Sequence, residues 1–147
     1  MESRVTIGVI DGQGGGIGSV IIKKIKEVYE ENVEIIALGT NAIATAQMMK
    51  AGANKGATGE NAILVTVPSM DIITGPIAII LANSMLGELT PKMADAISRS
   101  PAWKILLPLT QEKVVVVGAS KEPLPHLVET LVCEKLAEII SKIESIH

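Results

Sequence analysis

The first 40 residues combine two hydrophobic periods. Arg4 to Ile10 is an almost continuous β-branched run, which is typical of a strand buried in a parallel sheet. The next stretch repeats apolar residues every three or four positions and predicts an amphipathic helix that ends near Glu31. Val33 to Leu38 is β-like again. The order of strand, helix and strand predicts a βαβ unit.

The pattern is less regular in the middle of the chain. Ala42 to Lys50 predicts a second helix, and the glycine-rich stretch from Gly52 to Asn61 predicts a loop. Two short segments, Ala62 to Val67 and Asp71 to Thr74, predict the third and fourth strands. Ile77 to Leu86 is apolar almost all round, which indicates a buried helix, although a strand fits the same pattern.

The last third contains one more helix, two strands and a closing helix. Thr90 and Pro91 form a helix start, and that helix is expected to run to about Arg99. Trp103 to Leu109 and Lys113 to Gly118 predict two strands whose short connection allows a hairpin. A long helix is expected from Pro125 to Ile143. We therefore expect one domain over residues 1–147, with a three-layer, Rossmann-like α/β fold and a mostly parallel sheet with an antiparallel edge.

The strand-to-helix turn after Ile10 contains the densest group of glycines. Glycines at such a turn allow a ligand to approach the backbone, and the free amides of the following helix attract an anion. The turn therefore predicts a phosphate-binding site. Its candidate residues are Asp11, Gly12, Gln13, Gly14, Gly15, Gly16, Ile17 and Gly18.

Further candidates follow the later predicted strands. They are Gly39, Thr40 and Asn41 for a ribose or base, together with Gly59, Glu60, Asn61 and Gly75. The loop from Gly52 to Asn61 is expected to form a second wall of the site. The expected ligand is NADP, FMN or a purine nucleotide, because no acidic residue stands where NAD would need one.

Other interpretations of the same residues remain open. The glycines could serve only close packing of a helix on the sheet, and Asp11 could simply stabilise a turn. The chain could instead be an enzyme that uses Asp11, Glu60 or Asp71 as an acid or base on the glycine-loop side, with Lys55 against a phosphate. It could also be a structural protein, with Ile77 to Leu86 and the last helix at an oligomer interface.

Composition excludes several classes. A net charge of −3 and an aromatic content of 1% argue against nucleic acid as a partner. The longest uncharged run is interrupted and too short for a membrane span. Cys133, the only cysteine, is expected to be buried and unreactive, and His126 and His147 have no second ligand at metal spacing. These features favour a cytoplasmic protein without a metal, and we expect a homo-oligomer.

Three resemblances to known families bear on function. The spacing Gly12-x-x-x-Gly16-Ile17-Gly18 resembles the cofactor loop of short-chain dehydrogenases, but the catalytic Tyr-x-x-x-Lys of that family is absent, since Val33 stands four residues after Tyr29. The first 60 residues also resemble the nucleotide-binding half of the tubulin-like division GTPases, without their second glycine signature. Over nearly its whole length the chain resembles a family of small uncharacterised bacterial proteins, which implies a Rossmann-like fold and no assigned activity. That last likeness rests on Ile10 to Gly16, Gly39 to Asn41, Gly56 to Asn61, Gly75-Pro76 and Leu86 to Glu88.

Overall fold

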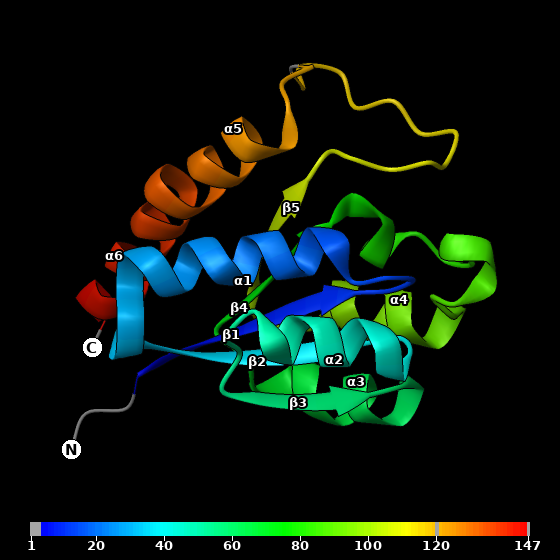
Figure 1. Ribbon diagram of the computed structural model, residues 1–147, viewed down its shortest axis with the longest axis horizontal. Helices are drawn as coiled ribbons and strands as arrows, with labels where there is room; N and C mark the ends of the chain where they lie inside the picture. Colours follow the sequence, from blue (N-terminus) through cyan, green and yellow to red (C-terminus); the bar gives the residue numbers. More distant parts are fainter. Residues whose placement is uncertain (1–3, 120, 147) are drawn as a thin grey trace.

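The structure is a computed structural model that describes residues 4–119 and 121–146. Its centre is a five-stranded sheet in the order β3-β2-β1-β4-β5, and every neighbouring pair is parallel (Figure 1). The strands are β1 (Val5–Asp11), β2 (Val33–Gly39), β3 (Lys55–Thr58), β4 (Ile72–Pro76) and β5 (Trp103–Leu107). All their carboxyl ends therefore meet at one edge of the sheet.

Helices cover both faces of the sheet, which makes the fold a three-layer α/β structure. The α-helices are α1 (Gly16–Tyr29), α2 (Ala42–Lys50), α3 (Glu60–Thr66), α4 (Pro91–Arg99), α5 (Leu124–Glu129) and α6 (Leu136–Ile146). A π-helical stretch, Thr130–Lys135, joins α5 to α6. Short 3₁₀ turns lie at Glu30–Asn32, Val67–Ser69, Ile77–Ile80 and Met85–Gly87.

The two faces of β1 supply two separate cores, because side chains alternate along a strand. Ile7 and Val9 point to the face that α1, α2, α5 and α6 cover, where the buried cluster includes Ile21 and Leu136. Ile10 points to the opposite face, which is covered by α3 and α4. No helix among the described residues is long and apolar enough to span a membrane.

Several predicted elements are confirmed. The first βαβ unit, α2, α4 and a strand at β5 lie within a few residues of the expected bounds. The closing helix is also confirmed and extends from Leu124 to Ile146, with the π-helical stretch inside it. Two of these helices have well-defined caps. Asn41 and Thr90 each accept a hydrogen bond from the third residue of the helix that follows.

The middle of the chain differs from the prediction. The expected loop from Gly52 to Asn61 contains strand β3, and the expected strand from Ala62 to Val67 is largely helix α3. Ile63 and Val67, four residues apart, are fully buried, whereas Val65 between them is 68% exposed. This spacing is helical. The segment is too short for its apolar content alone to distinguish a helix from a strand.

The expected buried helix from Ile77 to Leu86 was wrong. It contains a 3₁₀ turn, Ile77–Ile80, which ends because Leu81 is extended, with φ −103° and ψ 108°. Beyond it Asn83, Met85 and Leu86 have positive φ, and a right-handed α-helix cannot run through such residues. Leu86 is 98% exposed.

The expected antiparallel edge was also wrong. Strand β5 pairs in parallel with β4, and residues 113–118 form no strand. After β5 the Glu112 carboxylate accepts a hydrogen bond of 3.0 Å from the Met85 amide in the loop before α4. Figure 1 shows the segment that follows projecting from the body of the protein.

Candidate functional site

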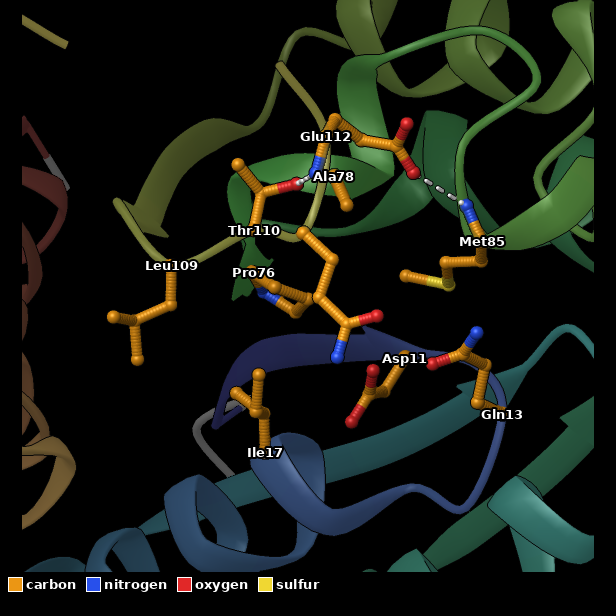
Figure 2. A pocket seen from close by; sticks show the side chains of 10 residues that line it. Asp11, Gln13, Ile17, Pro76, Ala78, Met85, Leu109, Thr110 and Glu112 are labelled. Carbon is orange, nitrogen blue, oxygen red and sulfur yellow. Dashed lines mark hydrogen bonds between the residues drawn. The ribbon is translucent and has the colours of Figure 1, made fainter. Parts of the chain in front are cut away.

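The sheet order creates a crevice at the carboxyl end of β1. The chain runs from β1 outward to β2 and β3, and then returns to the other side of β1 to form β4. The connections after β1 and β4 therefore leave in opposite directions, which is where open α/β sheets bind ligands. A pocket of about 330 Å³ lies at this position (Figure 2). It is lined by Asp11, Gln13, Ile17, Pro76, Ala78, Met85, Leu109, Thr110, Gln111 and Glu112.

Asp11, the last residue of β1, lies on the side of the pocket that the glycine turn forms. Its side chain accepts hydrogen bonds from the amides of Gly12 at 2.8 Å and Gly18 at 2.7 Å. Burial raises the pKa of Asp11, hydrogen bonds from the amides of Gly18, Gly12 and Ile17 counteract this in part, and the charge of Glu88 raises the pKa further. Amides at the start of α1 thus already face a carboxylate of the protein.

Glu88 joins three parts of the chain through one oxygen. Its Oε1 accepts hydrogen bonds from the Gln13 amide at 2.8 Å, the Thr40 hydroxyl at 2.7 Å and the Asn41 side-chain amide at 2.8 Å. Burial alone would raise the pKa of Glu88, but these three bonds outweigh it and hold the pKa below its ordinary value. The glycine turn, the turn after β2 and the loop before α4 are therefore fixed to one another.

The residues expected to hold a ribose or base have partners inside the protein. Thr40 donates to Glu88, and Asn41 donates to both Glu88 and the carbonyl of Gln13. The Asn41 side-chain oxygen accepts from the Ala44 amide and caps α2. Gly39 lies tightly against Thr45, since a Cβ at Gly39 would be 2.2 Å from the Thr45 hydroxyl. The geometry of this turn serves the structure.

The glycines of the turn fall into two groups. A Cβ at Gly12, Gly15 or Gly18 would approach Met85, Ala44 or Met48 within 2.8 Å, so these three permit close packing. Gly15 also has a φ of +71°, which favours glycine. By contrast, a Cβ at Gly14 or Gly16 would meet no atom within 4 Å. Gly14 and Gly16 are the places where the turn leaves open space.

The remaining residues that the sequence predicted for the site, Gly59, Glu60, Asn61 and Gly75, do not line the pocket. Gly75 packs β4 against β1, since a Cβ there would be 2.3 Å from the Ile10 carbonyl oxygen. Gly59, Glu60 and Asn61 follow the edge strand β3, two strands away from β1, and the Glu60 carboxylate accepts a hydrogen bond of 2.6 Å from the Thr90 hydroxyl.

Two charged candidates lie at the opposite edge of the sheet. Asp71 precedes β4 and accepts hydrogen bonds from the amide and hydroxyl of Thr6, so its expected place on the glycine-loop side was wrong. Lys55 opens β3 and forms a 3.5 Å ion pair with Glu34. Neither side chain lines the pocket.

The second wall of the pocket comes from residues 109–112 rather than from the expected loop at Gly52 to Asn61. In Figure 2, Thr110 and Glu112 lie across the pocket from Asp11. The sequence contained a polar Thr-Gln-Glu group here, which we interpreted as a hairpin turn. The polar residues of this wall were therefore visible in the sequence, but they were assigned to a hairpin turn instead of to the site.

Two further expectations concern cysteine and metals. Cys133 is exposed, so the prediction of a buried thiol was wrong: it lies in the π-helical stretch, beside the buried Val132. Within residues 4–119 and 121–146, no group of three or more His, Cys, Asp and Glu side chains could hold a metal ion. His147 lies outside the described residues.

The fold and the crevice together define a Rossmann-like α/β protein. The chain belongs to the family described as "Domain of unknown function (DUF3842)", whose model matches residues 6–141. No curated protein matches the chain significantly.

Solved structures with a similar fold are distant. One is a universal stress protein in complex with cAMP, with 16% identity and a TM-score of 0.42, and the match covers 71% of this chain and 98% of that one. Another is a dodecameric FMN-dependent UbiX-like decarboxylase from Escherichia coli O157:H7, with 13% identity, a TM-score of 0.48, and coverage of 96% and 94%.

Proposed function

We propose that this protein binds a purine mononucleotide or its nucleoside in the crevice between β1 and β4. The observation that carries the proposal is a pocket at the switch point of the sheet with the carboxylate of Asp11 in its wall. At about 330 Å³ the pocket is near the lower limit for small-molecule sites, which favours a mononucleotide over NADP.

The charges of the pocket decide which part of the ligand enters it. Its lining includes the carboxylates of Asp11 and Glu112 and no Lys, Arg or His. A phosphate inside would therefore face like charges without a compensating cation. Hydroxyl and amine donors of a nucleoside suit the carboxylates, since an ionised carboxylate has about four acceptor positions and Asp11 uses only some of them. Ile17, Pro76 and Met85 supply apolar contacts for a base.

A phosphate, when the ligand carries one, would extend out of the pocket toward Gly14 and Gly16. The first amides of a helix have no acceptor within that helix, and Gly16 opens α1. Open space surrounds both glycines. The glycine turn then contributes a weaker phosphate contact at the rim instead of a cradle around the anion.

The direct test is thermal unfolding with adenosine, guanosine, AMP, GMP, FMN and NADP. At a ligand concentration one hundred times Kd, stabilisation of about 2.7 kcal/mol is expected for a nucleoside or mononucleotide. Asp11→Asn should abolish the shift. Asp71→Asn is the matched control, because Asp71 also accepts a backbone amide but lies at the other edge of the sheet. If no compound raises the unfolding temperature, or if both variants behave alike, the proposal fails.

A second pair of variants keeps this test valid if Asp11→Asn destabilises the fold. Ile17→Trp narrows the pocket from a half-buried position without removing any side-chain hydrogen bond, and should weaken binding of adenosine and AMP equally. Gly16→Val adds a side chain in open space and should remove only the additional affinity of AMP over adenosine. Full binding of AMP to Ile17→Trp would place the site elsewhere.

A further inference from the structure

Asp11 is almost completely enclosed by the protein, and only a small part of its carboxylate can reach a ligand. The residue is 5% exposed, yet it lines the pocket (Figure 2). Its oxygens already accept hydrogen bonds from the amides of Gly12 and Gly18, and the Ile17 amide contributes a further one. A carboxylate has about four acceptor positions, so about one remains for a ligand. Asp11 therefore suits a single donor, such as a hydroxyl group, better than a pair of donors.

The position of Asp11 relative to the glycine turn indicates which part of a nucleotide it would meet. Its Oδ2 atom lies 2.7 Å from the amide nitrogen of Gly18, which is only two residues, or about 3 Å along the axis of α1, beyond Gly16. Under the proposed function a phosphate lies beside Gly14 and Gly16. In a nucleotide the sugar is bonded to the phosphate and the base follows the sugar. The ribose is therefore the part of the ligand that comes closest to Asp11.

The residues that the sequence assigned to a ribose do not compete for this role. Thr40 and Asn41 donate to Glu88 and to the carbonyl of Gln13, and neither side chain lines the pocket. Asp11 is the buried acceptor on the glycine-turn side of the pocket. The hydroxyl donors of a sugar bound here would thus face Asp11.

We propose that Asp11 accepts a hydrogen bond from one ribose hydroxyl and so makes that hydroxyl a requirement for tight binding. The inference rests on the proposed function and adds the part of the ligand that the site recognises. When the hydroxyl is missing, Asp11 keeps its amide partners, so the loss is that of one hydrogen bond to a charged group. Such a loss corresponds to an affinity about 10- to 100-fold lower.

Isothermal titration calorimetry of the unchanged protein with AMP, 2′-deoxy-AMP and 3′-deoxy-AMP tests the inference, and the three corresponding GMP compounds test it for the other purine. One deoxy analogue should bind about 10- to 100-fold more weakly than its parent, and the other should bind as tightly as the parent. Equal affinities of all three compounds, or an equal loss in both analogues, overturn the inference and leave the proposed function intact. If none of the six compounds binds, both fail.

A pair of variants tests whether Asp11 is the residue responsible. In Asp11→Ala, any binding that remains should no longer distinguish the parent nucleotide from its deoxy analogues, because the acceptor is gone. Asp71→Ala is the matched control and should retain the difference, since Asp71 also accepts a backbone amide but lies at the other edge of the sheet. Circular dichroism confirms that each variant is folded, and if Asp11→Ala is not, the titrations of the unchanged protein decide. A difference that persists in folded Asp11→Ala overturns the inference.

Discussion

The two walls of the crevice differ in how the protein holds them. The wall formed by the glycine turn is fixed by Asp11 and Glu88, which together accept five hydrogen bonds. Among the described residues, the wall formed by residues 109–112 has one hydrogen bond from the body of the protein, from the Met85 amide to Glu112, and it leads directly into the exposed valines Val114 to Val117. The first wall is thus held in place by the protein itself, whereas under the proposed function a ligand would order the second.

The largest expected effect lies in the fixed wall. Gly15→Ala should lower the free energy of unfolding by about 3 kcal/mol, because the added Cβ would lie 2.8 Å from the Ala44 carbonyl oxygen at a φ of +71°. Gly16→Ala, one residue on, should raise it by about 0.5 kcal/mol, since alanine favours the helix and nothing obstructs it. Urea unfolding measures both. Equal effects would show that the wall is not packed as described.

The next effect compares the carboxylates of the two walls. Glu88→Ala should cost about 2 kcal/mol, because three donors lose a charged acceptor. Glu112→Ala removes one such bond and should cost about 1 kcal/mol or less. Urea unfolding of the two variants at neutral pH makes the comparison. A larger loss for Glu112→Ala would reverse our ranking of the walls.

The pH dependence of the unfolding free energy distinguishes Glu88 from Asp11, the two carboxylates of the fixed wall. Because folding lowers the pKa of Glu88, its stabilisation is complete above the ordinary value of 4.5 and is lost as the pH falls through its folded pKa. Folding raises the pKa of Asp11, so its contribution is complete below 3.8 and is lost as the pH rises through its folded pKa.

Glu88→Gln should therefore flatten the decline of stability toward acid, whereas Asp11→Asn should make that decline steeper. Urea unfolding at a series of acid pH values provides the measurement. The same slope in both variants would contradict the opposite pKa shifts.

The smallest effect is expected just beyond the other wall. Val115→Thr should change the unfolding free energy by no more than about 0.5 kcal/mol, because the side chain is 90% exposed. Urea unfolding measures this value. A loss above 1 kcal/mol would mean that the valine packs within its own chain.

Long periodic segments explain what could be predicted from the sequence. The helical stripe from Ile17 to Val28 and the strand from Arg4 to Ile10 predicted the first βαβ unit because local pattern and burial agree there. Ala62 to Val67 was misassigned because so short a segment, with five apolar residues, is compatible with the period of a helix or of a strand. The position of the crevice followed from the glycines. The second wall of the crevice could not be predicted in the same way. The contact between residues 109–112 and Met85 depends on the order of the strands in the sheet, which the sequence pattern did not establish.

The polar residues near the glycine turn that were expected to bind a ligand were the hardest to interpret. Thr40, Asn41 and Glu88 appeared as separate polar motifs, and the sequence offered no sign that one oxygen joins them. Polar residues at strand ends are equally suited to bind a ligand or one another. The choice between binding a ligand and binding one another depends on distances between residues almost 50 positions apart in the chain. A single sequence does not contain these distances.

The π-helical stretch at Thr130–Lys135 sets the rotational phase of the final helix. A π turn holds more residues than an α turn, so it acts as a local insertion. If the same residues were wound as a regular α-helix, everything beyond the stretch would turn by about 100°. Ile139, Ile140 and Ile143 would then rotate off the sheet into water. The chain thus depends on an irregular winding to direct Ile139, Ile140 and Ile143 toward the sheet, and the same residues wound as an ideal helix would fit the core less well.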